Sequence, residues 1–432
     1  METAREYDVI VAGGGPSGIA AALAAAACGA RVLVIEREAV LGGNVARALV
    51  HTICGLFLPS PERQAVHAHA GLPRALATRL QKDGSAGGVE WAGGAGFVAI
   101  DPFAFASLAE CLLAENSRID VERGASVTVV ALADSGPSEV CFLGENGRAG
   151  RAAAWNVIDT SGDAVAATLA GAATEQAAAA DLQHASYIFR IDGADADALD
   201  NMERARTSTA VARAARSGEL PASACSIVVR AGLPAGSFYV TLNLPKPVSA
   251  GFDPLDAACF RSVEELAGRD ADAVFAFLVA TRPPLRHATI GAKAARFGIR
   301  ETRRVRGLVR LEQADVLAGT RRDDEACMST WPVELWHSHE RMTFRHVAAA
   351  SSIPLGCLVA DHPSGRLAMA GRCASASHEA LGAIRVIGTS MATGEAAGVL
   401  AALAAARRSS LAAIDAAEVR ALVASGATAE RV

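Results

Sequence analysis

Apolar runs and an alanine-rich helical pattern alternate at the start of the chain. Residues 7–12 (YDVIVA) are almost all apolar, which predicts a short buried strand. The Ala- and Leu-rich stretch 19–28 predicts a helix, and Gly29 stands where helices commonly end in glycine. A second apolar run, 31–35 (RVLVI), predicts another strand. The order strand, helix, strand indicates an α/β fold.

Later segments add elements of both kinds. Residues 103–116 place apolar side chains at helical spacing, and residues 119–130 predict a strand, a turn and a second strand. The alternating stretch 238–244 predicts a further sheet strand. The apolar residues 367–370 predict another strand, and the alanine-rich stretch from about 384 to 406 predicts a long helix.

A glycine motif joins the first strand to the first helix. Gly13, Gly15 and Gly18 follow the pattern Gly-x-Gly-x-x-Gly, whose glycines permit a tight turn, a close approach to a pyrophosphate, and helix packing on the sheet. The helix N-terminus offers unpaired N–H groups to the phosphates. Glu36, after the second strand, can accept hydrogen bonds from both ribose hydroxyls, and its charge would repel the 2′-phosphate of NADP. The motif predicts an adenine dinucleotide site; the alternative is a glycine-rich turn without a ligand.

Composition narrows the class of protein. The chain has 432 residues, 51% of them hydrophobic, with 41 Lys+Arg against 46 Asp+Glu. The apolar fraction excludes a mainly disordered chain, and the net charge of −5 argues against a nucleic-acid partner. The 9 cysteines are scattered singly, so we expect reduced thiols and a cytoplasmic location. The N-terminus lacks an apolar leader, and the alanine runs are shorter than the roughly 20 apolar residues that cross a bilayer, so we expect no membrane partner.

Three segments after the glycine motif resemble a known superfamily. The pair Gly43 and Asn44 follows the ribose acid, as in the FAD-binding domain of glutathione-reductase-like proteins. Residues 155–163 (WNVIDTSGD) resemble the strand and turn V-I-D-A-T-G-D, and residues 367–372 (LAMAGR) end in a similar A-G-R. The chain therefore resembles the glutathione-reductase-like and fumarate-reductase-like FAD-binding superfamily, which implies FAD rather than NAD.

A narrower resemblance is to a bacterial FAD-dependent oxidoreductase family, whose segments match residues 298–304 (GIRETRR) and 370–385. It implies an α/β fold in which a Rossmann-type, glutathione-reductase-like FAD-binding domain carries an inserted α+β substrate or cap domain. We place the first part of the FAD-binding domain at 1–173, the substrate or cap domain at 174–359, and the C-terminal part with the final helix at 360–432.

The resemblance also implies where FAD is held. The N-terminus of the last long helix would face the flavin pyrimidine and stabilise negative charge there. The backbone near Val127 would contact adenine. The residues expected to contact FAD are Gly13, Gly15, Pro16, Ser17, Gly18, Glu36, Arg37, Gly43, Asn44, Val127, Thr160, Gly162, Asp163, Gly371, Arg372, Gly382, Ala383 and Ile384.

Two missing patterns restrict the chemistry. The glycines at 93–96 are not followed by a suitable helix and acid, so no second dinucleotide motif is predicted. Cys54 has no second cysteine near it, so the redox cysteine pair of the disulfide reductases is missing. Electrons then come from the substrate or from a transient carrier. We predict an FAD-dependent oxidoreductase that removes a hydride from a small organic substrate, at a C–N or C–C bond, and is reoxidised by oxygen or another acceptor. The alternatives are a flavin-dependent monooxygenase served by a separate reductase and a non-catalytic FAD-binding protein.

Three residues are candidates for the reaction itself. His378 could accept a proton or bind a substrate carboxylate, or it could hydrogen-bond backbone where a strand turns into a helix. Arg300 could pair with the flavin or an anionic substrate, or form a structural ion pair with a residue such as Glu334. His51 lies on the segment expected to pass the flavin. The resemblance to fumarate reductases allows a covalent bond there; the alternative is an ordinary buried imidazole.

Two His-x-His pairs, His67 with His69 and His337 with His339, could bind a metal, because alternate residues of a strand share a face. The sequence shows no third ligand for either pair. We therefore predict no metal site and interpret both pairs as structural.

Overall fold

The computed structural model describes residues 5–246, 254–430 and 432, so the first four residues, on which the expectation about a leader partly rests, lie outside it. Its centre is a seven-stranded sheet. The sheet contains, in order, β6 (Ile119–Glu122), β2 (Val32–Ile35), β1 (Arg5–Ala12), β9 (Ala149–Asp159), β8 (Ser138–Gly144) and β7 (Ala125–Ala131), with β20 (Leu367–Met369) also paired to β9. The strands predicted at the start of the chain, at 119–130 and at 367–370 are confirmed.

The sheet divides along β9. The strands β6, β2, β1, β9 and β20 run parallel, whereas β8 and β7 are antiparallel to their neighbours. β9 pairs with β8 through Ala154 and with β20 from Val157 onward. Its last residues therefore lie between β1 and β20, and the turn after β9 meets the turn after β1 at one edge of the sheet.

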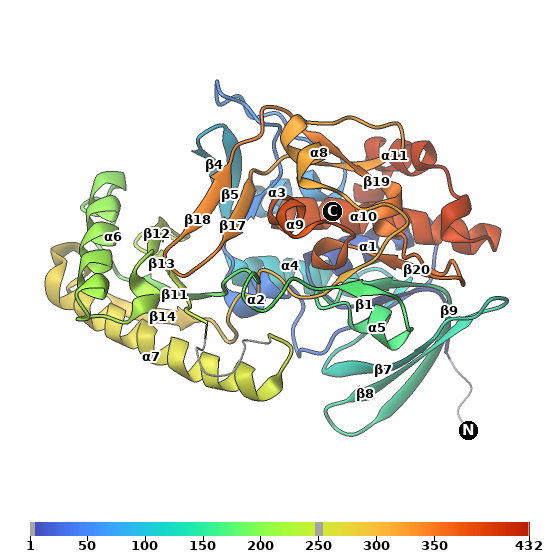
Figure 1. Cartoon of the computed structure of the whole chain (residues 1–432), viewed down its shortest axis with the longest axis horizontal. Helices are drawn as coiled ribbons and strands as arrows, with labels where there is room; N and C mark the ends of the chain where they lie inside the picture. Colours follow the sequence, from blue (N-terminus) through green and yellow to red (C-terminus); the bar gives the residue numbers. More distant parts are fainter. Residues whose placement is uncertain (1–4, 247–253, 431) are drawn as a thin grey trace.

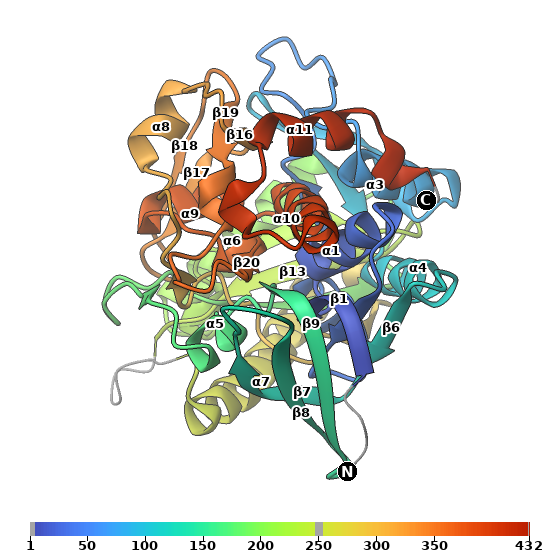
Figure 2. The same ribbon diagram turned by 90° about the vertical axis from the view of Figure 1, so that its right-hand side faces the viewer.

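Two alanine-rich helices, α1 (Pro16–Ala27) and α10 (Ile387–Arg407), lie side by side over the sheet (Figure 2). They approach so closely that a Cβ built on Gly394 would lie 2.1 Å from the carbonyl oxygen of Ser17. A Cβ on Gly398 would lie 2.2 Å from the carbonyl oxygen of Ala21. The alanine excess is thus a packing requirement, because larger side chains would separate the helices.

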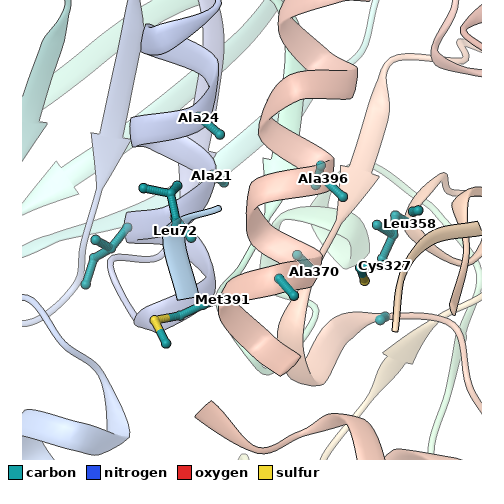
Figure 3. Close-up of a cluster of buried hydrophobic side chains, with 14 of the residues drawn as sticks. Ala21, Ala24, Leu72, Cys327, Leu358, Ala370, Met391 and Ala396 are labelled. Atoms are coloured by element: carbon teal, nitrogen blue, oxygen red, sulfur yellow. The ribbon is translucent and has the colours of Figure 1, made fainter. Parts of the chain in front are cut away.

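Figure 3 shows this core: Ala21 and Ala24 of α1 face α10, which carries Met391 and Ala396. α10 is long and apolar enough to cross a membrane, but 94% of its most apolar window is buried inside the fold. It therefore has the burial of a central core helix.

A separate antiparallel sheet stands at one end of the molecule, on the left of Figure 1. Its order is β12 (Val228–Ala231), β13 (Phe238–Asn243), β11 (Ser186–Asp192) and β14 (Thr289–Lys293), and it packs with α6 (Asn201–Arg216) and α7 (Ala257–Thr281). β13 confirms the strand predicted at 238–244. The buried apolar residues around this sheet form a cluster of their own. The molecule therefore combines a Rossmann-like mixed sheet with an antiparallel sheet domain; the domain boundaries at 173 and 359 stay a prediction.

Shorter elements connect the two sheets. The small sheets are β3 (Thr52–Cys54) with β5 (Ala95–Ile100) and β4 (Ala86–Ala92), β16 (Glu325–Ser329) with β19 (Ser351–Pro354), β17 (Val333–Trp336) with β18 (Met342–Arg345), and β10 (Thr174–Glu175) with β15 (Arg304–Val305). The remaining α-helices of the described residues are α2 (Asn44–Ala48), α3 (Leu72–Lys82), α4 (Pro102–Ala114), α5 (Val165–Leu169), α8 (Gln313–Ala318), α9 (His378–Ile384) and α11 (Ala416–Ala424).

The long helix predicted from about 384 differs from the structure at its start. α9 ends at Ile384, and α10 begins only at Ile387, after the extended residue Val386. Ser377 caps α9, because its hydroxyl accepts a hydrogen bond from the Ala380 N–H at 3.1 Å. His378 therefore opens a short separate helix and is not adjacent to the N-terminus of α10.

Candidate cofactor and substrate site

Sterics fix the glycine loop between β1 and α1. Gly13 has a φ of +112°, a region that favours glycine, and a Cβ on it would lie 2.7 Å from the carbonyl oxygen of Thr160. A Cβ on Gly18 would lie 1.8 Å from the Gly13 carbonyl oxygen. The Thr160 hydroxyl donates to that same oxygen at 2.7 Å. The loop is therefore closed against the end of β9, as the motif predicts.

Gly15 instead faces open space. A Cβ on it would meet only the Cα of Gly43, at 3.9 Å. Gly43 has a φ of +51° and precedes α2, while the first turn of α1 contains no acidic residue. Two glycine backbones and a helix N-terminus thus face one groove, an arrangement that fits the pyrophosphate of FAD. We call it the nucleotide groove; of the predicted contacts it is lined by Gly13, Gly15, Pro16, Ser17, Glu36, Arg37, Gly43, Asn44, Thr160, Gly162 and Arg372.

The acid at the end of β2 is held by backbone donors. Glu36 is buried, and its two carboxylate oxygens accept hydrogen bonds from the N–H groups of Gly14, at 2.5 Å, and Glu38, at 2.8 Å. Burial raises the pKa of Glu36, although these two hydrogen bonds act in the opposite direction. The carboxylate is therefore fixed at the wall of the groove, where its remaining lone pairs can accept hydrogen bonds from ribose hydroxyls.

An ion pair between half-buried Arg372 and buried Asp163 joins the segments around the groove. The Arg372 guanidinium lies 2.6 Å from the Asp163 carboxylate and also donates to the carbonyl oxygens of Gly162, at 2.9 Å, and Ile299, at 2.8 Å. Asp163 also lies 3.5 Å from the Arg37 guanidinium. Arg372 thus joins its own segment to residues 162–163 and to Ile299, so it stabilises the fold as well as facing the groove.

The other predicted cofactor contacts lie outside the described lining of the groove. Val127 is in β7, and Gly371 is buried with its N–H donating to the Thr393 hydroxyl at 3.0 Å. Residues 382–384 are buried in α9, where a Cβ on Gly382 would lie 2.7 Å from the Glu334 carbonyl oxygen. The break between α9 and α10 explains this placement, because Arg385 and Ile387 line the groove instead.

A second cavity of about 220 Å³ adjoins the groove and shares Asn44, Ile299, Arg372, Arg385 and Ile387 with it. We call it the side-chain pocket. Its walls come from β3, the antiparallel sheet, the β17 region and the start of α10. Val386 precedes α10 without a side-chain cap, and the first turn of that helix has no acidic residue. A partial positive charge therefore faces the place where the groove and the side-chain pocket meet.

Arg230 of β12 gives the side-chain pocket a positive charge. Its guanidinium lies over the Phe97 ring at 4.8 Å, and within the described ranges no carboxylate is within ion-pair distance of it. Its charge contributes to the lowered pKa of His51. An unpaired guanidinium beside a cavity can bind a carboxylate in a bidentate manner. Sequence reasoning missed Arg230, because nothing along the chain distinguishes it from a solvated arginine.

His51 lines the side-chain pocket as a neutral imidazole. Its ring stacks on Tyr239 with centroids 4.3 Å apart, and Nδ1 lies 3.1 Å from the Leu49 carbonyl oxygen. Burial, with the charge of Arg230, lowers the pKa of His51 to about 3. Its buried Nε2 has no hydrogen-bond partner among the described residues. With Nδ1 protonated toward Leu49, Nε2 is a buried acceptor without a partner among the described residues.

Arg300 lines the same pocket, but its donors are already used. One terminal nitrogen donates to the His184 carbonyl oxygen and the other to Asn243 Oδ1, at 2.8 Å. The guanidinium lies over the Trp336 ring at 4.6 Å. Burial, together with the neighbouring charge of Arg385, lowers the pKa of Arg300 to about 9. The structure therefore shows Arg300 joining β13, β17 and His184, which precedes β11, with both terminal nitrogens already donating hydrogen bonds.

Glu334 is the acid of the side-chain pocket. Its carboxylate accepts hydrogen bonds from the indole N–H groups of Trp331, at 3.2 Å, and Trp336, at 2.7 Å. The same carboxylate lies 3.5 Å from the Arg385 guanidinium. Burial alone would raise the pKa of Glu334, but Arg385, Arg300 and the indoles together lower it. Alternation along β17 places Glu334 and Trp336 on one face, which is the sequence signal that could have identified this cluster.

His378 lies apart from His51 and Arg300. Its Nδ1 lies 2.9 Å from a carboxylate oxygen of buried Glu301, which also pairs with Arg304. The hydrogen bond to Glu301 raises the pKa of His378, although burial acts against it. The ring borders another cavity of about 1070 Å³, which we call the arginine cleft; it is lined by Arg304, Arg306, Arg310, Arg341 and Arg345 among others.

A family model described as FAD dependent oxidoreductase matches residues 8–423. Among curated proteins no relative matches the chain. The chain is thus similar to one family over nearly its whole length.

The solved structures to which the chain is similar are distant from it in sequence. The p-nitrophenol 4-monooxygenase of Pseudomonas putida DLL-E4 is 14% identical, with a TM-score of 0.49 over 98% of this chain and 88% of that one. A geranylgeranyl bacteriochlorophyll reductase-like protein of Thermoplasma acidophilum is 14% identical, with a TM-score of 0.45 over 98% of this chain and 91% of that one. The flavin-dependent monooxygenase PieE, in complex with FAD and substrate, is 12% identical, with a TM-score of 0.42 over 93% of this chain and 58% of that one.

Proposed function

Because the chain belongs to the family of FAD-dependent oxidoreductases, we propose that it removes a hydride from a small organic anion. The observation that carries this proposal is the unpaired Arg230 guanidinium in a pocket that adjoins the nucleotide groove. The bond oxidised would be C–N, or C–C beside a carbonyl, within reach of the groove.

FAD, when bound, supplies the two-electron acceptor for this reaction. The nucleotide groove would hold it through the backbone at Gly15 and Gly43, the carboxylate of Glu36, and the N-terminus of α1. The N-terminus of α10 would favour negative charge at the junction with the side-chain pocket.

The chain's own residues orient the substrate. Arg230 binds its carboxylate and so fixes one end of the molecule. His51 forms part of the pocket wall as a neutral imidazole, since its low pKa keeps the ring unprotonated at neutral pH. The indoles of Trp331 and Trp336 exclude water and hold the Glu334 carboxylate in place by hydrogen bonds.

The reaction balances without a further reductant. A substrate C–H bond breaks and its electron pair leaves as hydride, while an adjacent N–H, O–H or C–H gives up a proton to water, so the product gains one double bond. Oxygen then takes the two electrons and two protons and becomes hydrogen peroxide, or another acceptor takes them.

Anaerobic mixing with a panel of amino acids, 2-hydroxy acids and saturated acids, each beside its uncharged amide, tests the proposal. Bleaching of the flavin absorbance by a carboxylate and not by its amide supports it. Bleaching by amides alone would overturn the role of Arg230. Incorporation of ¹⁸O from labelled oxygen into the product would support the monooxygenase alternative, and a panel without any bleaching would favour a non-catalytic flavoprotein.

A further inference from the structure

Three potential metal ligands meet at the seam between the antiparallel sheet and the β17–β18 hairpin. Cys225 precedes β12, and His339 and Glu340 lie in the turn between β17 and β18. The thiol sulfur, an imidazole nitrogen and a carboxylate oxygen all lie within 4.8 Å of one another. Cys225 is buried, His339 half-buried and Glu340 exposed. One thiol, one imidazole and one carboxylate therefore converge beside solvent.

The donor set and spacing suit a zinc ion. Zinc bonds of about 2.0–2.3 Å in a tetrahedron place neighbouring donors roughly 3.5 Å apart. The three donor atoms lie within 4.8 Å of one another, so they need to approach by about 1.3 Å at most. The exposed Glu340 side chain can make that movement by a change of rotamer. Solvent on its side leaves a fourth position for water.

The backbone on both sides of the cluster is already joined. The Ser226 hydroxyl donates to the His339 carbonyl oxygen, and the Asn243 amide donates to the Ser226 carbonyl oxygen at 3.1 Å. Because Asn243 also binds Arg300, these contacts connect the cluster to the side-chain pocket. The ligand-bearing segments are therefore positioned before any ion arrives, which lowers the entropic cost of binding.

One nearby cation opposes the ion. The Arg216 guanidinium lies 4.0 Å from the Glu340 carboxylate and donates to the Cys225 carbonyl oxygen at 3.5 Å. At 4.0 Å, with both side chains largely exposed, this ion pair is weak. A divalent ion that binds Glu340 would displace it.

We propose that Cys225, His339 and Glu340 bind Zn²⁺ with one water, and that the ion ties β12 to β17. Binding replaces the thiol proton by a sulfur–zinc bond, so one proton leaves and no electron moves. β12 carries Arg230 and β17 carries Glu334 and ends at Trp336, so the ion would hold two walls of the side-chain pocket at a fixed separation. The sequence pairs His339 only with His337, whereas the proposed site joins His339 to Glu340 and to Cys225, which lies more than 100 residues away in the chain.

The test uses the purified FAD-loaded protein, equilibrated by dialysis against buffered Zn²⁺ and then measured for metal by mass spectrometry. We expect one zinc per chain, and X-ray absorption at the zinc edge to show one sulfur ligand with nitrogen and oxygen ligands. Cys225→Ser and His339→Gln should each weaken binding at least about tenfold. Cys141→Ser is the matched control, because Cys141 lies 3.7 Å from Glu139 and keeps the new site intact.

A stability measurement separates a bound ion from surface association. Zn²⁺ should raise the melting temperature of the wild type and of Cys141→Ser, but not of Cys225→Ser. Arg216→Gln should bind zinc more tightly, because it removes the competitor for Glu340. Equal zinc affinity in the wild type and Cys225→Ser, or an absorption spectrum without sulfur, would overturn the proposal.

Discussion

The nucleotide groove and the side-chain pocket adjoin each other but are built in opposite ways. The part of the groove that fits a pyrophosphate is made of glycine backbone: Gly13 and Gly18 close the loop, and Gly15 and Gly43 leave it open. The pocket is made of side chains from β3, β12, β13, β17 and the start of α10, and among the described arginines that line it Arg230 is the one with neither an ion pair nor a side-chain hydrogen bond. A site made of backbone requires particular residues close together in the chain, so it leaves a short sequence motif. A site made of side chains requires only that they meet after folding, so it leaves no such motif.

This difference has a consequence for substitution. In the groove, each added atom meets either the protein itself or the space for the ligand, so folding and binding can be separated residue by residue. In the pocket, most polar groups already hold one another, so the free groups alone can select a substrate. Single substitutions in each region can therefore test that division.

Gly15→Ala should abolish FAD binding while the protein still folds. The new Cβ meets no protein atom nearer than 3.9 Å and enters the space for the pyrophosphate. The weaker helix N-cap costs about 1 kcal/mol of stability at most. The ratio of flavin to protein absorbance after purification, together with the melting temperature of the apoprotein, measures both effects.

Two matched glycine variants complete that experiment. Gly18→Ala places a Cβ 1.8 Å from a backbone oxygen and should destabilise the apoprotein itself, by about 1–3 kcal/mol or more. Gly88→Ala meets nothing within 4 Å and should change neither quantity. If Gly15→Ala retained wild-type FAD content, the groove would not be the pyrophosphate site.

Residues of α10 line both the groove and the side-chain pocket, and this helix carries the buried acid Glu395. We expect this acid to make the stability of the protein depend on pH. Burial raises the pKa of Glu395 to about 7, against hydrogen bonds from the Thr428 hydroxyl and the Leu72 N–H. The folded state then binds the proton more tightly than the unfolded state, so stability falls as pH rises from about 4.5 to 7. The loss is about 3 kcal/mol in the free energy of unfolding.

Glu395→Gln keeps the shape of the neutral acid and should remove that loss. Denaturant unfolding at pH 5 and pH 8 measures the free energy of unfolding. The variant should be more stable than the wild type at pH 8 but not at pH 5. The exposed Glu115→Gln serves as the control for general charge effects. A constant difference between Glu395→Gln and the wild type at both pH values would contradict the assignment.

Arg230→Gln should weaken the binding of a simple carboxylate to the side-chain pocket. A charge-assisted hydrogen bond contributes about 2 kcal/mol, which corresponds to about thirtyfold in affinity. The change of the flavin spectrum on titration with benzoate measures it, and benzamide should bind the wild type and the variant alike. Arg310→Gln, in the arginine cleft, is the matched control. If Arg230→Gln bound benzoate as tightly as the wild type, Arg230 would not be a ligand of the carboxylate.

The same division explains what the sequence could predict. The strands β1, β2 and β20, the groove glycines and Glu36 follow from local patterns, because each depends on residues close in the chain. Arg230 and Trp331 could not be identified, because their surroundings come from segments that the chain brings together only after folding. The start of α10 was misplaced because a single extended residue, Val386, breaks a run of helix-forming composition.

His378 provides the smallest expected effect and the sharpest test of that limit. Its ring faces the arginine cleft and binds Glu301, so His378→Gln should leave benzoate affinity and flavin content within about twofold of the wild type. The raised pKa of His378 means that the protonated form stabilises the fold below pH 6.5, and that this contribution disappears as pH rises through the folded-state pKa. The variant should therefore be less stable than the wild type at pH 6 and equally stable at pH 9. A loss of benzoate binding or of turnover at unchanged stability would instead assign His378 to the substrate site, and would show that the groove and the side-chain pocket are not the whole of it.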